Sequence, residues 1–126
     1  MKSKWNKKWR SSKRPSKQRK YRYNIPLHLG GSLLSVNLSK ELRKKYGKRN
    51  IRVRKGDRVK LMRGQFRKKT GEVAKISIKH KRVYVSGVEI IKMDGNKIAY
   101  PLDPSNLMIT ELNLEDKKRK KSLERK

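Results

Sequence analysis

The chain has 126 residues, of which 33% are hydrophobic, and its 39 Lys and Arg against 10 Asp and Glu give a formal net charge of +29. Self-repulsion on this scale opposes folding unless a polyanion neutralises it, so nucleic acid is the favoured class of partner. No stretch approaches the roughly 20 apolar residues of a membrane-spanning helix, and the polar N-terminus lacks a signal peptide's apolar segment, so we expect no membrane insertion. The lack of cysteine excludes disulfides and cysteine-bound zinc.

Residues 1–32 are predicted to be a basic arm and linker. Residues 1–24 contain no acid and too little apolar surface to fold alone, so we expect an extended arm without stable structure when free. Aromatic residues stand among the basic ones, which suits RNA because phosphates attract the cations and unpaired bases stack on the rings. A solvated tail or a targeting signal is the alternative. The predicted RNA-binding residues are Trp5, Lys7, Lys8, Trp9, Arg10, Lys13, Arg14, Arg19, Lys20, Tyr21, Arg22 and Tyr23.

A short helix from Lys40 to Tyr46 is predicted within a helical preface, residues 33–50. Ser39 is a suitable N-cap, and Gly47 is placed to end the helix. Apolar residues recur every four positions, and we expect this stripe to pack on protein; it comprises Leu38, Leu42 and Tyr46. The cations expected to face outward toward RNA are Arg43, Lys44 and Lys45. The preceding segment "IPLHLGGSLL" is punctuated by Pro and Gly and has no predicted conformation.

Residues 51–111 follow a period of two, which is typical of half-buried strands. The alternation changes phase between Val73 and Ile76, and this change predicts a β-bulge or a sharp bend. Asp94 and Gly95 lie between two apolar runs and predict a hairpin turn. Several short strands joined by tight turns predict a mainly β fold with a small, strongly bent barrel.

The stretch from Arg54 to Val73 combines glycines, positive charge and short apolar alternation. Its glycines are placed at turns and at close approaches of the backbone, and the interval "QFRKK" is predicted to be a loop tip. The pattern of a phosphate-binding nucleotide loop is absent, so nucleotide hydrolysis is not expected. Predicted turn residues are Gly56, Asp57, Gly64 and Gly71. Predicted RNA-binding residues are Arg54, Lys55, Arg63, Phe66, Arg67, Lys68 and Lys69.

Residues 112–126 are predicted to be a basic C-terminal helix. Asn113 is the expected N-cap, the acids Glu115 and Asp116 fall in the first turn, and the basic run 117–121 follows. Leu114 and Leu123 are the only apolar residues that follow, so this helix has little to bury and is expected to need a partner to become ordered.

The succession of Val53, Gly56-Asp57, Val59, Leu61, Gly64, Gly71 and Val73 resembles the KOW motif, which implies an SH3-like barrel. The flanking segments "LSKELRKKYGKRNIRVRKGD", "YPLDPSNLMIT" and "KKRKKSLERK" resemble the archaeal and eukaryotic branch of the large-subunit ribosomal protein L-twenty-four family (L-twenty-six in eukaryotes). The "YP" and "PSN" stretch favours an archaeon. The sequence departs from the motif at Gln65, where a small or acidic residue is usual, and in "FRKK", where a glycine often stands.

The resemblance implies a structural constituent of the large ribosomal subunit in the cytoplasm. It implies binding to large-subunit ribosomal RNA early in assembly, near the polypeptide exit tunnel, beside neighbouring ribosomal proteins. The alternatives are a KOW-containing transcription elongation factor and a DNA-compacting protein. We expect no enzymatic activity, cofactor, metal or small-molecule substrate, because the acids are scattered and the two histidines lack ligand spacing.

Overall fold

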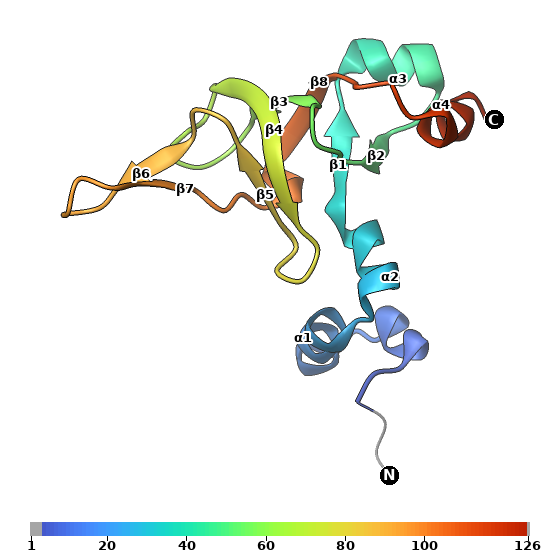
Figure 1. Ribbon diagram of the computed structural model, residues 1–126. Helices are drawn as coiled ribbons and strands as arrows, with labels where there is room; N and C mark the ends of the chain where they lie inside the picture. The colour runs from blue at the N-terminus through green and yellow to red at the C-terminus, as the bar shows by residue number, and fades with distance from the viewer. Residues whose placement is uncertain (1–3, 126) are drawn as a thin grey trace.

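The computed structural model describes residues 4–125, so residues 1–3 of the predicted arm and residue 126 of the predicted tail lie outside the described part. The fold is mainly β and agrees with the expected small SH3-like barrel (Figure 1). The helical elements, with η for 3-10 helices, are η1 (Lys7–Ser11), α1 (Pro15–Asn24), α2 (Leu27–Gly30), η2 (Gly31–Leu34), α3 (Lys40–Tyr46), η3 (Pro104–Asn106) and α4 (Lys117–Glu124). The strands are β1 (Ser35–Leu38), β2 (Asn50–Arg52), β3 (Arg58–Leu61), β4 (Thr70–Ser77), β5 (Arg82–Val85), β6 (Glu89–Ile91), β7 (Lys97–Ala99) and β8 (Leu107–Glu111).

A six-stranded sheet in the order β2-β1-β8-β3-β4-β5 forms the body of the molecule. β1 and β8 are parallel, and the other neighbours in this sheet are antiparallel. A single bridge between Val83 and Leu102 brings β5 against the segment that leads into β8. The strands β6 and β7 form a separate antiparallel hairpin that projects sideways from the body (Figure 1).

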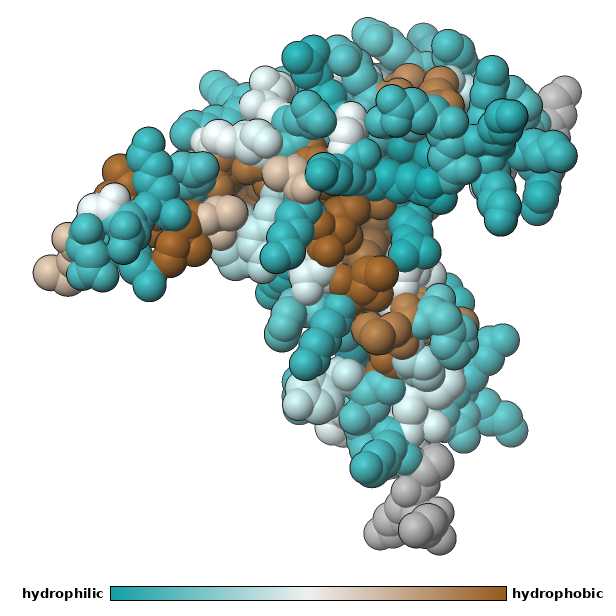
Figure 2. Space-filling view, viewed as in Figure 1, coloured by the Kyte–Doolittle hydropathy of each residue, from teal (hydrophilic) through white to brown (hydrophobic). Residues whose placement is uncertain are grey.

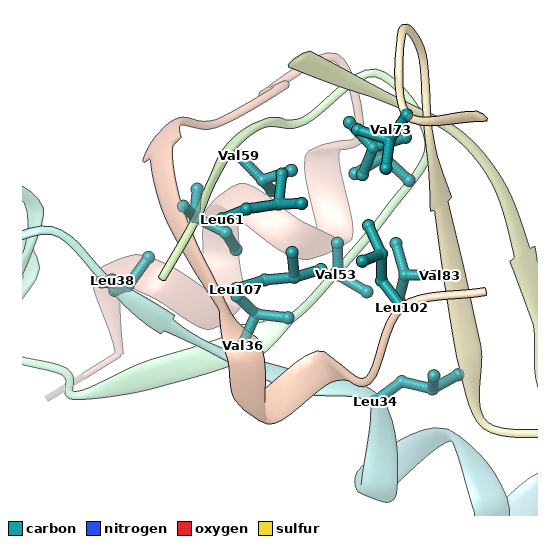
Figure 3. Packing of buried hydrophobic residues seen from close by; sticks show 13 residues of the cluster. Leu34, Val36, Leu38, Val53, Val59, Leu61, Val73, Val83, Leu102 and Leu107 are labelled. Atoms are coloured by element: carbon teal, nitrogen blue, oxygen red, sulfur yellow. The ribbon is translucent and has the colours of Figure 1, made fainter. Parts of the chain in front are cut away.

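The core contains valine, leucine and isoleucine side chains from the six-stranded sheet and its connections (Figure 3). Val59, Val73 and Val83 are fully buried, as the alternation of the sequence predicts for strands with one face inward. Phe66 and Tyr100 pack at the edge of this cluster and are only half-buried. Within the described residues, no aromatic side chain belongs to the buried members of this cluster, so β-branched and leucine side chains provide the packing of the barrel.

Three local predictions are confirmed. Helix α3 spans Lys40–Tyr46, with Ser39 as its N-cap and Gly47 in the left-handed conformation at its end. The β4–β5 register shifts between Val73 and Lys75, which is the predicted bulge. The hairpin turn falls at Asp94-Gly95, where the Gly95 N–H donates to the Lys92 carbonyl.

The predicted helical stripe is only partly correct, because Leu38 belongs to a strand. Residues 35–38 form β1, which pairs with both β2 and β8, and Val36 and Leu38 of this strand are buried. Two apolar residues in alternation are too weak a signal for a strand. β1 therefore carries the segment before α3 into the main sheet.

The arm differs from the expected extended chain, since η1 and α1 lie within it. Arg14 precedes α1, and proline at position 15 starts it, as proline does at the first position of a helix. The Gln18 side-chain amide donates to the carbonyl oxygens of Trp9, Arg10 and Ser12, and these bonds tie η1 to α1. Tyr21 and Ile25 are buried, so the segment does find a small apolar contact despite its composition.

The predicted cap of the C-terminal helix is wrong. Helix α4 begins after Asp116, whose carboxylate accepts from the Lys118 N–H, whereas Asn113 caps an earlier turn by accepting from the Glu115 N–H. Both residue types suit an N-cap, and the later one has the helix directly after it. The helix also buries more than expected, because Leu123 and Arg119 are both enclosed. No helix within residues 4–125 is long and apolar enough to cross a membrane.

Candidate nucleic-acid interface

Asp57 fixes the turn that launches β3. Its side chain is fully buried, and its two carboxylate oxygens accept from the backbone N–H groups of Arg54 (2.8 Å) and Asn113 (3.0 Å). Arg119 of α4 adds a forked pair of bonds, 2.5 Å from Nη1 and 2.6 Å from Nη2. One carboxylate therefore joins the turn, the segment after β8 and the C-terminal helix, and this network is what orders α4 against the barrel.

The turn glycines have different physical reasons. Gly56 and Gly64 have φ of +86° and +90°, a region that favours glycine. Gly71 instead lies where the backbone of the β5–β6 connection comes close. A Cβ built there would sit 2.6 Å from the Ser86 carbonyl oxygen and 2.7 Å from Val85 Cγ1. These positions shape the connections from which the basic loop extends.

The predicted loop tip joins β3 to β4 and carries exposed cations; these are Arg63, Arg67, Lys68 and Lys69. Phe66 is half-buried and packs edge-on against Tyr100, with ring centres 5.2 Å apart, while Lys69 Nζ lies 5.1 Å from the centre of the Phe66 ring. The Phe66 side chain therefore packs between the loop and Tyr100, and only part of its ring is exposed to solvent. Lys68 has φ of +73° and occupies the stretch where a glycine is usual in the motif.

A cleft of about 130 Å³ lies beside this loop, where Phe66 and Tyr100 meet the segment before β8. Arg63 is among the residues that line it, and Arg82 forms an ion pair with Asp103 there at 3.1 Å. Burial raises the pKa of Asp103, but hydrogen bonds from the Ser105 hydroxyl and N–H, with the charges of Arg82 and Arg22, outweigh this effect and lower it overall. The carboxylate stays ionised at neutral pH and holds the Arg82 guanidinium in place.

The aromatic side chains of the arm are paired with residues of the arm itself. Trp5 and Tyr21 lie with ring centres 5.4 Å apart, and Tyr21 is only 8% exposed. Trp9 is half-buried, and Lys20 Nζ lies 5.0 Å from the centre of its ring. Tyr23 is the contrast, because 86% of it is exposed. Of the four aromatic residues predicted to contact RNA, Tyr23 is thus the one whose ring is most accessible.

The fold brings the arm against a turn that sequence reasoning did not single out. Arg19, Arg22 and Tyr23 of α1 line a shallow cleft with His80 and Lys81 of the β4–β5 turn, and these five residues are called the arm–turn surface below. Lys81 Nζ donates to the Arg22 carbonyl. Partial burial, and then the charge of Arg22, lower the pKa of Lys81. Two cationic segments lie side by side here, and this arrangement favours an anion between or over them.

The remaining predicted cations are spread over the surface. The exposed cations in and after η1 are Lys7, Lys8, Arg10, Lys13 and Arg14. Those in α3 and in the turn before β3 are Lys44, Lys45 and Lys55. Arg43 is half-buried rather than fully outward, and Arg54 forms an ion pair with Asp116. Helix α4 adds exposed lysines that were not predicted as contacts, Lys117, Lys118, Lys120 and Lys121.

Two features were missed because they are long-range. The Asp57–Arg119 pair joins residues 62 positions apart, and the sequence marks neither residue as the partner of the other. The run of positive charge in "KHKR", residues 79–82, was a detectable signal for the β4–β5 turn, but nothing local places it beside α1. Within the described chain, no group of three or more His, Asp or Glu side chains is arranged to hold a metal ion.

Comparison with known proteins identifies a family and two similar archaeal proteins. A family of ribosomal proteins, described as L26 in eukaryotes and L24 in archaea, matches residues 12–126. A protein of Korarchaeum cryptofilum called "Large ribosomal subunit protein uL24" is 50% identical over 115 residues, covering 91% of this chain and 88% of that protein. A protein of the same name from Methanospirillum hungatei is 52% identical over 112 residues, covering 89% of this chain and 93% of that protein. With its mainly β body, its KOW-like turn and these similarities along most of its length, the chain belongs to the family of eukaryotic L26 and archaeal L24 ribosomal proteins, in its archaeal branch.

Proposed function

We propose that this protein is a structural constituent of the large ribosomal subunit that binds ribosomal RNA through exposed cations held on a rigid barrel. Family membership supports a structural role rather than an enzymatic one. The observation that carries RNA binding is how the structure uses its few acids. Four of the ten acids, Asp57, Asp103, Glu111 and Asp116, form ion pairs with arginines of the barrel and of the segments that pack on it. The arm, the β3–β4 loop and α4 are left strongly cationic.

The arm–turn surface and the β3–β4 loop are the two proposed primary contacts. Phosphate groups would lie against Arg19, Arg22 and Lys81 on one surface and against Arg63 and Arg67 on the other. Arginine suits this task because its planar guanidinium donates in pairs to phosphate oxygens. Such contacts release counterions, so affinity should fall steeply as salt rises.

Tyr23 is the proposed stacking residue of the arm. Its exposed ring lies among cations, an arrangement that serves an unpaired base and its neighbouring phosphates together. The paired rings of Trp5 and Tyr21 would instead hold the arm in shape, while the exposed lysines of η1 contact the backbone of the RNA.

The position in the ribosome is proposed from the family. We infer binding early in assembly of the subunit, near the polypeptide exit tunnel, in contact with neighbouring ribosomal proteins in the cytoplasm. The family match and the two archaeal relatives support the large subunit as the location, since both relatives carry a large-subunit name.

Sedimentation of the tagged chain from an archaeal lysate, at moderate and at high salt, tests the proposal. We expect the chain to move with the large subunit and to remain there through the high-salt wash. Release into the light fractions at both salts, alongside RNA polymerase, would contradict it and favour a transcription elongation factor.

A pair of charge-matched variants tests the surface. The double variant Arg22→Asn and Lys81→Asn removes two cations of the arm–turn surface, and asparagine tolerates the positive φ at position 81. The control, Lys92→Asn with Lys97→Asn, removes the same charge from the β6–β7 hairpin. We expect the first variant to leave the subunit at lower salt than the control. If both variants left the subunit at the same salt, retention would depend only on total charge, and this result would contradict the arm–turn surface as a contact.

A further inference from the structure

The β6–β7 hairpin is unusual for its exposed apolar side chains. Ile90, Ile91 and Ile98 are 43%, 67% and 44% exposed, and Met93 at the tip is fully exposed. Both strands are exposed along their whole length, and in Figure 2 brown side chains lie among teal ones on the projecting part of the molecule that corresponds to this hairpin. Scattered exposed apolar residues need no explanation, but a cluster on one projecting element does.

The hairpin is held firmly at its base and is free at its tip. Val88 is buried in the core, and its carbonyl accepts from the Tyr100 N–H, so the core anchors both ends of the hairpin. Between them, three residue pairs and the bond from Lys92 N–H to the Asn96 carbonyl keep the strands in register. A two-stranded hairpin alone is marginal in water, and the anchored base is what preforms this one.

Charge distinguishes this element from the rest of the chain. Glu89 and Asp94 balance Lys92 and Lys97, so residues 89–99 carry no net formal charge in a chain of +29. An RNA-binding element would be expected to present cations, and the exposed isoleucines here offer a phosphate nothing. The hairpin is therefore a poor surface for RNA.

The same charges argue against two other occupants. Two copies of a chain of +29 would repel each other strongly, which disfavours self-association through the hairpin. A segment that lies in a membrane surface normally pairs its apolar side with a basic one, and this hairpin has balanced charges instead. A different protein is what remains, and a neutral or acidic partner would also be attracted by the cationic body behind the hairpin.

We propose that the β6–β7 hairpin is a docking surface for another protein whose contact surface is apolar and carries no net positive charge. Met93 and Ile91 would enter a pocket of the partner, with Ile90 and Ile98 packed beside them. The partner would then be held at the projecting part of the hairpin, apart from the arm that is proposed to hold RNA (Figure 1). The β3–β4 loop lies at the base of the hairpin, where Phe66 packs against Tyr100, so RNA on this loop and the partner would be neighbours.

Photo-crosslinking in intact cells tests the proposal. The probe is benzoylphenylalanine, placed at Met93 in one tagged chain and at Tyr23 in another. The cells are irradiated before any fractionation, so the hairpin is read whether or not the chain sediments with the large subunit. We expect the Met93 probe to give one product that resists ribonuclease and contains a single protein, identified by mass spectrometry. We expect the Tyr23 probe to give a product that ribonuclease degrades.

A second substitution shows whether the contact depends on the apolar side chains. Ile91→Asp, combined with the Met93 probe, should lower the yield of the protein product about tenfold, the scale of losing one buried anchor. The control Lys92→Ser should leave the yield unchanged. Four results would overturn the proposal: a ribonuclease-sensitive product at Met93, a product between two copies of this chain, no product there, or a protein product that Ile91→Asp does not reduce. Loss of the RNA product at Tyr23 alone would instead count against the proposed function.

Discussion

Asp57 and Arg119 show how one ion pair can connect the middle of a chain with its C-terminal helix. Both side chains are enclosed, and the carboxylate uses both oxygens to join the β3 turn with α4. Replacing such a pair with apolar residues can be neutral, but removing one partner leaves a buried charge without compensation. The contribution of this ion pair to stability is therefore measured best by replacing one of its two side chains.

Arg119→Met is predicted to lower the free energy of unfolding by about 3–5 kcal/mol, because Asp57 would stay buried without its guanidinium. Chemical denaturation at fixed salt measures it. Lys120→Met, an exposed neighbour on α4, is the control and should change the value by less than about 0.5 kcal/mol. Equal losses in both variants would contradict the assigned role of Arg119.

Lys68 carries backbone strain, with φ of +73° at a residue that has a Cβ. Lys68→Gly is predicted to raise the free energy of unfolding by about 0.5–1 kcal/mol, because relief of the left-handed conformation exceeds the entropy that glycine loses on folding. Lys69→Gly removes the same charge without positive φ and should lower stability. A loss of stability in both variants would show that Lys68 is not strained.

Asp103 gives the protein a predicted dependence on pH. Its pKa is lowered in the folded state from the ordinary value of 3.8, so its contribution to stability is complete above that value and is lost as pH falls through the folded one. Asp103→Asn should therefore be less stable than the natural chain by the same amount at pH 7 and at pH 5, and the difference should shrink below about pH 4. A difference that stays constant down to pH 3 would exclude this carboxylate as the cause.

The elements of the fold differ in how far sequence alone could predict them. Helix α3 and the β6–β7 turn were predictable because Ser39, Gly47 and the Asp94-Gly95 pair act within a few residues. The bulge near Ala74 was also predictable, since a change of phase in a period-two pattern is local. β1 was not, because its strand character comes from pairing with β2 and with the distant β8.

The candidate interface could likewise be predicted only as far as its signals are local in the sequence. Charge and aromatic residues marked the arm and the loop from the sequence, but burial decided which rings remain accessible. Tyr21 and Tyr23 are two positions apart, yet one is enclosed and the other is exposed. His80 and Lys81 joined the candidate surface only through tertiary contact with α1.

The approach of β4 to the backbone after β5 makes a prediction for Gly71. Gly71→Ala should lower the free energy of unfolding by about 1–3 kcal/mol, because the added Cβ meets the Ser86 carbonyl oxygen, which belongs to backbone and cannot easily move. Gly30→Ala is the control, since its Cβ would lie 3.5 Å from Ile78 Cγ2, an ordinary contact. If Gly71→Ala were as stable as Gly30→Ala, the strands would not be as close as described.

At the scale of the whole molecule, a small barrel carries three outgrowths with different surface chemistry. The arm is basic with partly accessible aromatic rings, the end with α3 and α4 is basic, and the β6–β7 hairpin is neutral and apolar (Figure 1, Figure 2). A net charge of +29 on so small a core means that folding and binding to a polyanion support each other.

Charge alone makes any polyanion a ligand, so the central claim needs a comparison of two RNAs. The most direct measurement is the equilibrium affinity of the purified chain for large-subunit and for small-subunit ribosomal RNA from the same archaeon, each at several salt concentrations. Specific recognition predicts that both affinities fall as salt rises, while the large-subunit RNA stays favoured by about tenfold or more at every concentration. Equal affinities at each salt would contradict the account, because the surfaces described would then hold RNA only as a polyanion.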